Sequence, residues 1–483
     1  MTEKKLHTVE KIGGTSMSNY AAVRDNIILR GEEAADIYNR IFVVSAYGGI
    51  TNMLLEHKKS GTPGVFALFA SGEEENDDWR VALEEVRVKI EAINASIFTD
   101  DSVLKKANQF IGERLDETER CLSDLQRICQ HGHFALQAHL DTVREMLSSI
   151  GEAHSAWNTA QLLRMDNINA RFVDLTGWKA ETPLSLDERI EQAFKDINLE
   201  TELPIATGYA HTDAGLMSVF DRGYSEMTFS RIAVLTGARE AVIHKEYHLS
   251  SADPKLVGEE NAVPIGRTNY DVADQLANLG MEAIHPRAAK GLRESGIPLR
   301  VKNTFEPDHD GTLVTVDYVS ETPCVEIIAG RKGIYAIECF DQNMIGGVAN
   351  YDRELLELIA RFKGPVVTKD INANTITHYL GANLKTVKRI RQKIAERFPE
   401  ASLQVRKVAL VSVIGSDMKV PGMLSKTVSA LAKADISILA MHQSMRQVDM
   451  QFVVDENDYQ GAIKSLHSAL VEVHDHGDAI CAA

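Results

Sequence analysis

A glycine turn near the N-terminus, Lys11-Ile-Gly-Gly-Thr-Ser16, brings together groups that bind phosphate. Gly13 and Gly14 allow the backbone to come close to a ligand. The free amides of such a turn, and of a helix that follows it, attract anionic oxygens. Lys11 adds a positive charge, and Thr15 and Ser16 add hydroxyl groups. The lysine precedes the glycines, so the turn is not a Walker-type P-loop. From these residues alone it is either a phosphate cradle or a tight turn with a surface lysine.

A second polar glycine loop, Ser45-Ala-Tyr-Gly-Gly-Ile-Thr-Asn52, follows the apolar run Ile41–Ser45, which is typical of a strand buried on both faces. The first turn also follows a strand-like stretch, and helical spacing predicts a helix over Asn19–Arg40 between the two. Such a β-α-β unit belongs to a parallel sheet, and ligands collect at the carboxyl ends of its strands. Both loops are therefore predicted at the same edge of one sheet.

Two charged residues further along the chain suit an amino-acid substrate. Glu152 lies in Gly151-Glu-Ala-His-Ser155, which is predicted to open a helix, where an acidic side chain is also a common partner of the helix dipole. Arg222 lies in Asp221-Arg-Gly-Tyr-Ser-Glu226, before another predicted helix. Its guanidinium group can hold a carboxylate with two hydrogen bonds or form a surface ion pair. The residues alone leave both alternatives open.

The composition is that of a globular chain with room for two to four domains: 483 residues, 44% of them hydrophobic and 25% charged. The net charge of −17 and the lack of a basic block argue against binding to nucleic acid or an anionic membrane. Five scattered cysteines predict neither a zinc site nor a disulfide framework. No signal peptide and no apolar run of roughly 20 residues is found, so a cytoplasmic location is predicted.

Alternating strands and helices over residues 1–316 predict an α/β domain, a three-layer αβα sandwich around a mostly parallel sheet. The charged, helical stretch of residues 62–150 is expected to form an insertion. After it, two successive α+β modules of βαββαβ type are predicted, over residues 323–405 and 406–483, and their similarity suggests an internal duplication.

With these motifs, the chain resembles the aspartate kinases of the amino-acid-kinase family over nearly its whole length. The two glycine loops resemble the family's K-F-G-G-T-S and V-S-A-x-x-G-x-T-N motifs. The segments around Glu152 and Arg222 resemble G-E-x-x-S and G-R-G-G-S-D. Three further matches follow in the family's order: Ala252-Asp-Pro254, His285-Pro286 and Gly311-Thr-Leu313. The C-terminal modules resemble the family's paired ACT modules.

The resemblance implies ATP-dependent phosphorylation of the β-carboxylate of L-aspartate to 4-phospho-L-aspartate. Lys11 would neutralise the transferred phosphoryl group, Glu152 would bind the α-ammonium group and Arg222 the α-carboxylate. Mg²⁺ would sit mainly on ATP oxygens and water, so no protein metal ligands are expected. Further implied contacts are Gly13, Gly14, Thr15, Ser16 and Gly49 for phosphate; Ser45, Thr51, Gly223, Ser225 and Glu226 for aspartate; and Lys245, Glu246, Ser250, Asp253 and Lys255 for the nucleotide.

Several positions depart from the family pattern. Tyr224 replaces a glycine and Glu226 an aspartate; in the nucleotide loop, Ser250 replaces a tyrosine and Lys255 an arginine. The family lysine shortly before His-Pro is Glu282. These variants resemble the branch of aspartate kinases dedicated to ectoine. In the first ACT-like module, Val367–Asn374 stands where the family has a serine- and glutamate-bearing strand for its amino-acid effector. This difference predicts weak or altered feedback by lysine or threonine.

Three alternatives remain: a glutamate 5-kinase, a carbamate or nucleotide-monophosphate kinase, and a non-catalytic ACT-type sensor with a decayed kinase domain. The first two lack the paired C-terminal modules, and the third is disfavoured by the presence of Lys11, Thr51, Glu152 and Arg222. Paired ACT modules make a homodimer the expected assembly, with a possible amino-acid effector.

Overall fold

The computed structural model describes residues 7–30, 37–58, 60–71, 77–179, 182–220, 223–279, 281, 284–474 and 476–481. The chain divides into two compact units. The first consists of Met1–His248 with Ile284–Val316, and the second of Leu249–Ala283 with Asp317–Ala483. The segment Leu249–Ala283, which the sequence motifs assign to the kinase domain, thus packs with the C-terminal unit.

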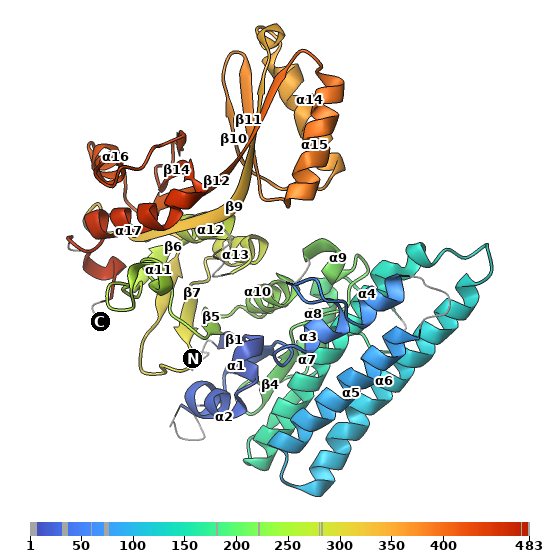
Figure 1. Cartoon of the computed structure of the whole chain (residues 1–483). Helices are drawn as coiled ribbons and strands as arrows, with labels where there is room; N and C mark the ends of the chain where they lie inside the picture. The colour runs from blue at the N-terminus through green and yellow to red at the C-terminus, as the bar shows by residue number, and fades with distance from the viewer. Residues whose placement is uncertain are drawn as a thin grey trace. The chain divides into compact units, whose positions relative to one another are not determined.

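The first unit is built on a sheet in the order β3-β4-β2-β1-β5-β7-β8 (Figure 1). All its pairings are parallel except that of β8 with β7. This confirms the predicted α/β class. The strands are β1 (Thr8–Ile12), β2 (Arg40–Val44), β3 (Ala170–Val173), β4 (Leu203–Thr207), β5 (Glu240–Lys245), β7 (Leu299–Asn303) and β8 (Thr312–Thr315).

Helices cover this sheet, and α5, α6 and α7 lie side by side in one layer (Figure 1). The helix predicted over Asn19–Arg40 is shorter: the π-helix η1, which follows α2, ends at Leu29, and its C-cap Arg30 has a left-handed conformation. The helices are α1 (Gly14–Met17), α2 (Tyr20–Ala22), η1 (Val23–Leu29), α3 (Ile50–Leu54), α4 (Val65–Ala70), α5 (Asp78–Ile97), α6 (Asp101–Cys129), η3 (Leu136–His139), α7 (Leu140–Met165), α8 (Leu186–Phe194), α9 (Leu216–Phe220), α10 (Tyr224–Thr236) and α13 (Pro286–Glu294).

Helix α7 corrects one prediction. It begins at Leu140, so Glu152 lies in the middle of a 26-residue helix and not in its first turn. The first-turn acid is Asp141. Gly151 is tolerated in the interior because α7 passes close to the second glycine loop: a Cβ atom there would lie 2.8 Å from the Ala46 Cβ. The helix-dipole explanation of Glu152 therefore does not hold.

The second unit contains an antiparallel sheet in the order β10-β11-β9-β12-β14-β13. The strand predicted over Ile436–Ala440 begins only at Ala440. The strands are β9 (Ile327–Phe340), β10 (Val366–Ile371), β11 (Thr375–Leu380), β12 (Ser402–Ile414), β13 (Ala440–Gln443) and β14 (Asp449–Asp455), and β6 (Arg267–Asn269) also lies in this part of the chain. The helices are α11 (Pro254–Val257), α12 (Tyr270–Asn278), η5 (Gln342–Met344), α14 (Val348–Arg361), α15 (Leu384–Arg397), α16 (Met423–Lys433), η6 (Glu456–Asp458), α17 (Tyr459–Leu470) and η7 (Gly477–Ala479).

Two long strands join the two predicted ACT-like modules into one sheet. β9 and β12 run antiparallel over their full length, with Ile327 opposite Ile414 and Phe340 opposite Ser402. Figure 1 shows α14 and α15 beside one half of the pair, where Leu355 and Ile390 belong to the shared core. The other half packs with α16 and α17. Each half is thus a helix-covered α+β module.

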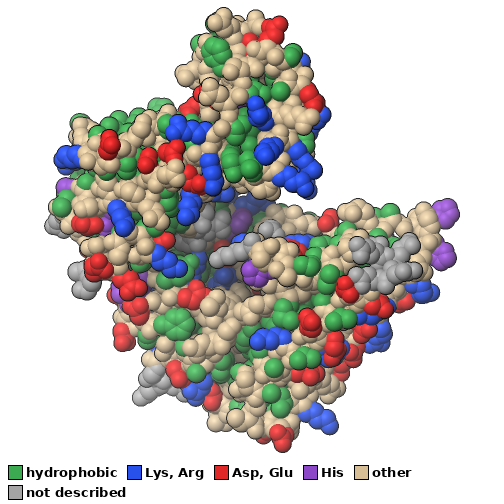
Figure 2. Space-filling model, viewed as in Figure 1, with side chains coloured by type: hydrophobic (Ala, Val, Ile, Leu, Met, Phe, Trp, Pro, Cys, Tyr) green, Lys and Arg blue, Asp and Glu red, His purple; other side chains and the backbone are tan. Residues whose placement is uncertain are grey.

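On the face seen in Figure 2, acidic and basic side chains alternate over the exposed helices of the insertion. None of the helices that the structure describes is long and apolar enough to span a bilayer.

Candidate active site

The two glycine loops lie together at the carboxyl ends of β1 and β2. Gly13 precedes α1 and Gly49 precedes α3, where it adopts φ +88°. Ser18 links the loops, because its Oγ accepts a hydrogen bond from the Gly48 amide (2.8 Å) and donates one to the Gly14 carbonyl (3.2 Å). A Cβ atom on Gly14 would lie 2.7 Å from the Ala46 carbonyl oxygen, so this close approach requires glycine.

Helix α7 is anchored to the second loop one turn after Glu152. The Ser155 hydroxyl donates a hydrogen bond to the Ser45 carbonyl (2.8 Å). Thr51 lies half-buried in α3, just after the same loop. The side chain of Glu152 is thereby fixed in position relative to the glycine loops.

Lys11 lies in β1 with its side chain almost wholly buried. Its Nζ is 3.6 Å from Oε1 of Glu226, in the first turn of α10. The other Glu226 oxygen accepts a hydrogen bond from the His285 amide. Gly223 allows this packing, since a Cβ atom there would lie 2.5 Å from the His285 ring. The Lys11 ammonium group is therefore held at the carboxyl end of the sheet.

Glu152 is a buried carboxylate with an unsatisfied oxygen. It is 2% exposed, and its Oε2 has no hydrogen-bond partner among the described residues. Burial raises its pKa to about 8, against the opposing effects of the Lys11 ammonium group and the Tyr224 hydroxyl. An unpaired carboxylate in such a place is costly, so the site suits a bound cation.

The end of β4 leaves room beside this oxygen. A Cβ atom on Gly208 would lie 3.0 Å from Glu152 Oε2 and 2.8 Å from the Cβ of Ser225. Ser225 is buried in the first turn of α10. Lys11, Glu152 and Ser225 are therefore brought to one place by four elements, β1, α7, β4 and α10.

Two tyrosines of this site were missed as functional residues. Tyr224 is 3% exposed, and its hydroxyl forms a hydrogen bond with Glu152 that lowers the pKa of that carboxyl group. Its ring packs edge-to-face on Tyr209, with centroids 5.6 Å apart. The sequence shows Tyr224 only as a departure from glycine; that substitution was the one signal that pointed to it.

Some predicted site residues have other surroundings. The Ser16 hydroxyl is buried and hydrogen-bonded to the Thr304 hydroxyl at the end of β7 (3.0 Å), whereas Thr15 is exposed. Arg222 and Asp221 lie outside the described residues, as does Glu282.

The predicted nucleotide-binding residues are divided between the two units. Lys245 ends β5 and Glu246 follows it in the first unit, whereas Ser250, Asp253 and Lys255 belong to the second. There Asp253 caps α11 by accepting a hydrogen bond from the Lys255 amide (3.0 Å). The carboxylate of Asp253 thus already has a structural role.

Glu10, next to Lys11 in β1, forms a buried ionic cluster. Its oxygens lie 2.7 Å from Arg40 Nε, 2.9 Å from Arg30 Nη2 and 2.7 Å from His244 Nε2. Burial by itself would raise its pKa, but Arg40, His244 and Arg30 together hold it well below the usual range. Consecutive residues of a strand face opposite sides of the sheet, so this cluster is separate from the site around Lys11.

Comparison with known proteins shows the family of this chain. Residues 7–303 match the model of the amino acid kinase family, and residues 411–470 match an ACT domain. The chain is 57% identical to the aspartate kinase Ask_Ect of Stutzerimonas stutzeri, over 99% of this chain and all of that protein. It is 22% identical to the chloroplastic aspartokinase 2 of Arabidopsis thaliana, over 98% of this chain and 85% of the relative.

Solved structures show the same fold. Escherichia coli aspartokinase III, in complex with aspartate and ADP, matches 96% of this chain and 99% of its own, with a TM-score of 0.70 and 21% identity. The same enzyme with lysine and aspartate matches with a TM-score of 0.71.

Proposed function

This chain belongs to the aspartate kinases of the amino acid kinase family, and we propose how its residues divide the work of phosphorylating L-aspartate. The observation that carries the proposal is Glu152, a buried carboxylate with one unpaired oxygen and a raised pKa. The α-ammonium group of aspartate supplies the missing cation and hydrogen-bond donor.

The α-carboxylate of the substrate is bound by groups around the second loop and the start of α10. Arg222 binds the α-carboxylate in a bidentate manner, as the family resemblance implies. Thr51 and Ser225 are assigned as further polar contacts of aspartate. Ser45, Gly223 and Glu226 are assigned to the same substrate. Two fixed points on the α-carbon leave the β-carboxylate oriented toward the glycine turn.

Phosphoryl transfer then needs positioning and charge neutralisation. A β-carboxylate oxygen attacks the γ-phosphorus of ATP, the bond to the β,γ-bridging oxygen breaks, and ADP leaves with that electron pair. A carboxylate is ionised at pH 7, so no general base is required. Lys11 and the amides of Gly13, Gly14 and Gly49 reduce the repulsion between the two anions, which dominates the barrier.

Mg²⁺ would supply further neutralisation on the phosphate oxygens. Among the described residues, no three His, Cys, Asp or Glu side chains gather into a metal site. We propose an ion held mainly by ATP oxygens and water, as is usual for Mg²⁺. Lys245 and Glu246 are assigned to the nucleotide, and Ser250 and Lys255 remain proposed contacts from the second unit.

The product is proposed to enter ectoine synthesis in the cytoplasm. Support comes from the Ask_Ect relative at 57% identity, whose name points to that pathway, and from the altered nucleotide loop. Because ectoine is a compatible solute, the abundance of the protein should rise in cells grown at high salt. An unchanged level would contradict the assignment.

Feedback by lysine or threonine is proposed to be weak. In β10 the charged side chains already have partners within the chain: Lys369 pairs with Asp352 (2.6 Å), and Asp370 accepts from the Tyr379 hydroxyl (2.7 Å). A steep inhibition curve with either amino acid at low concentration would contradict this.

We further assign dimerisation to the ACT-like modules. β10 is an edge strand and exposes Val366 and Ile371, and exposed apolar edges are sites of association. Ile371→Lys should shift the protein from dimer to monomer in light scattering without loss of helical content. An unchanged mass would place the interface elsewhere.

One assay tests the reaction itself. Purified protein with Mg-ATP, L-aspartate and hydroxylamine should form aspartyl hydroxamate, and L-glutamate in place of aspartate should give little product. Arg222→Ala should raise KM for aspartate more than KM for ATP; equal effects would contradict its role. A signal with glutamate alone would contradict the substrate assignment.

A further inference from the structure

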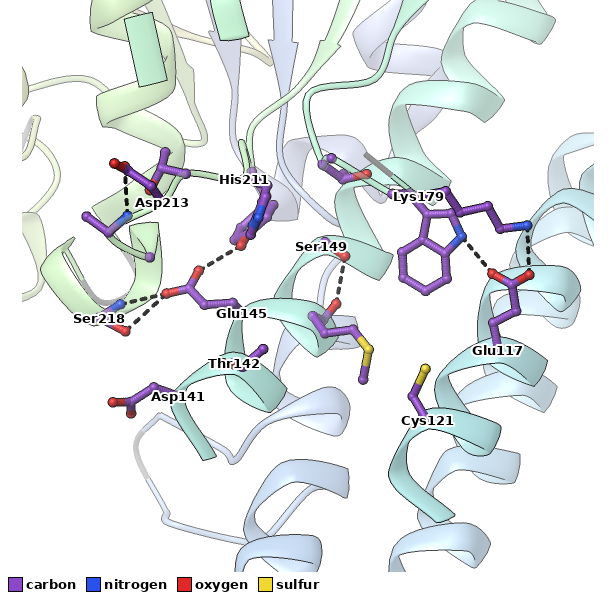
Figure 3. A pocket seen from close by; sticks show the side chains of 18 residues that line it. Glu117, Cys121, Asp141, Thr142, Glu145, Ser149, Lys179, His211, Asp213 and Ser218 are labelled. Carbon is purple, nitrogen blue, oxygen red and sulfur yellow. Dashed lines mark hydrogen bonds and ion pairs between the residues drawn. The ribbon is translucent and has the colours of Figure 1, made fainter. Parts of the chain in front are cut away.

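The first unit contains a second cavity, of about 520 Å³, whose lining does not include Lys11, Glu152 or Ser225. It lies between α6, α7 and the loops that follow β3 and β4 (Figure 3). The sheet order places β1 and β5, with the phosphate and nucleotide groups, on the other side of β2 from these two strands. The cavity therefore lies beside the site around Lys11 and Glu152, at the same carboxyl edge, and shares Tyr209 with it.

The walls of this cavity are fixed before any ligand binds. Gly177 packs against His211 so closely that a Cβ atom would lie 2.7 Å from the His211 Cβ. Trp178 donates its indole N–H to Glu117 (3.1 Å), and Arg114 lies over its ring at 5.1 Å. Preformed concave sites with an aromatic wall and a few polar groups are typical of small-ligand binding.

The cavity holds more negative than positive charge. Figure 3 shows Asp141 and Glu145 on successive turns of α7, with Asp213 on the facing loop. Glu145 is 5% exposed, and its hydrogen-bond donors among the described residues are neutral: the Tyr209 hydroxyl and the amide and hydroxyl of Ser218. None of the three carboxylates forms an ion pair with a described residue.

The remaining charges do not compensate them. Lys179 is the one ammonium group of the described lining, and it pairs with Glu117 at 2.7 Å. Burial and the nearby Arg189 lower the pKa of His211, against the opposing effects of Glu145 and Asp213. A buried carboxylate with neutral donors on one side and an open cavity on the other favours a cation in that cavity.

We propose that this cavity binds a small alkylammonium compound, with its ammonium group between Asp141, Glu145 and Asp213 and its hydrocarbon part against Trp178. The aromatic wall suits both the alkyl chain and the cationic charge. The ligand class is thus a primary amine of amino-acid size, distinct from the phosphates and the dicarboxylic acid of the kinase site.

Calorimetry on the full chain tests the proposal with 1,4-diaminobutane as probe and 1,4-butanediol as its uncharged counterpart. Salt at about 0.15 M suppresses general attraction to the acidic surface. The diamine should bind saturably and the diol should not. Asp141→Asn, an exposed and fold-neutral change, should weaken diamine binding about fivefold, whereas Asp124→Asn on α6, outside the cavity, should leave it unchanged.

Fluorescence locates the ligand. Trp178 is one of three tryptophans, so the diamine should change the emission of the wild-type protein. Trp178→Phe should keep the binding heat and lose the emission change. Any one of four results would overturn the proposal. In calorimetry, these are the absence of saturable heat, equal binding of the diol, or an Asp141→Asn response equal to that of Asp124→Asn. In fluorescence, it is an emission change that survives in Trp178→Phe. No substrate is present, so this result is independent of the kinase assignments.

Discussion

Two buried glutamates of the first unit, Glu10 and Glu152, have opposite surroundings. Glu10 is paired with Arg40, Arg30 and His244, and its pKa is lowered. Glu152 is equally buried, has an unpaired oxygen, and its pKa is raised to about 8. A carboxylate whose charge is compensated within the protein stabilises the fold, whereas one left uncompensated is available for a ligand. Lys11 is next to Glu10 in β1, but it faces the other side of the sheet and acts on Glu152.

The largest effect is expected from Lys11→Ala. Removing the ammonium group leaves the repulsion between ATP and the β-carboxylate uncompensated, so kcat should fall by about 10³-fold or more, measured by hydroxamate formation. The Lys11 ammonium group also pairs with Glu226 and lowers the pKa of Glu152, so the melting temperature of the variant is measured as the control for folding. A kcat within tenfold of the wild type would remove Lys11 from the catalytic group.

Glu10→Gln should reduce stability and leave the kinetic constants of the remaining folded enzyme nearly unchanged. Loss of the carboxylate leaves buried Arg40 without its charge partner, which costs about 3 kcal/mol, measured by urea unfolding. The direction in which this stability contribution changes with pH follows from the lowered pKa of Glu10. Glu10 stabilises the fold above its unfolded-state pKa, and this contribution is lost as pH falls through the folded-state value.

Glu152→Gln should do the reverse. Above about pH 8, where Glu152 is ionised, the stability of the variant should be equal to or above that of the wild type, because a buried charge is removed. KM for aspartate should rise about 100-fold. A marked destabilisation with an unchanged KM would show that the contrast with Glu10 is false.

The pH dependence sharpens the same contrast. Because the pKa of Glu152 is raised to about 8, the folded protein holds this proton over a pH range in which the unfolded chain has released it. The stability contribution of this group therefore falls as pH rises toward 8. Aspartate binding needs the ionised form, so kcat/KM for aspartate should rise up to about pH 8 and flatten above it. Glu152→Gln should abolish this rise.

The smallest effect is expected from Tyr224→Phe. Loss of the hydroxyl removes one hydrogen bond to Glu152 and should raise KM for aspartate about tenfold. It should also move the midpoint of the pH profile upward, since the hydroxyl lowers the pKa of Glu152. Tyr38→Phe is the matched control, because Tyr38 precedes β2 and its hydroxyl accepts only the Asn169 amide (3.1 Å). An unmoved pH profile would reduce Tyr224 to a packing residue.

Local patterns predicted much of the fold because they depend on neighbours in sequence. The apolar run before Ser45 is β2, and the two glycine loops follow strands that pair in parallel. The start of α7 was misplaced because Gly151 resembles a helix boundary, whereas packing against Ala46 decides that a glycine is needed inside the helix.

The sequence by itself determined the α/β class, a C-terminal ACT domain and the family, because ordered glycine and charge motifs are specific in combination. Only the tertiary structure decided which side chains lack a partner. Glu152 has an unpaired oxygen, Ser16 is hydrogen-bonded to Thr304, and Tyr224 contacts Glu152. Each of these facts depends on residues that are far away in the chain. Burial and pairing are sums over neighbours in space, which no local pattern contains.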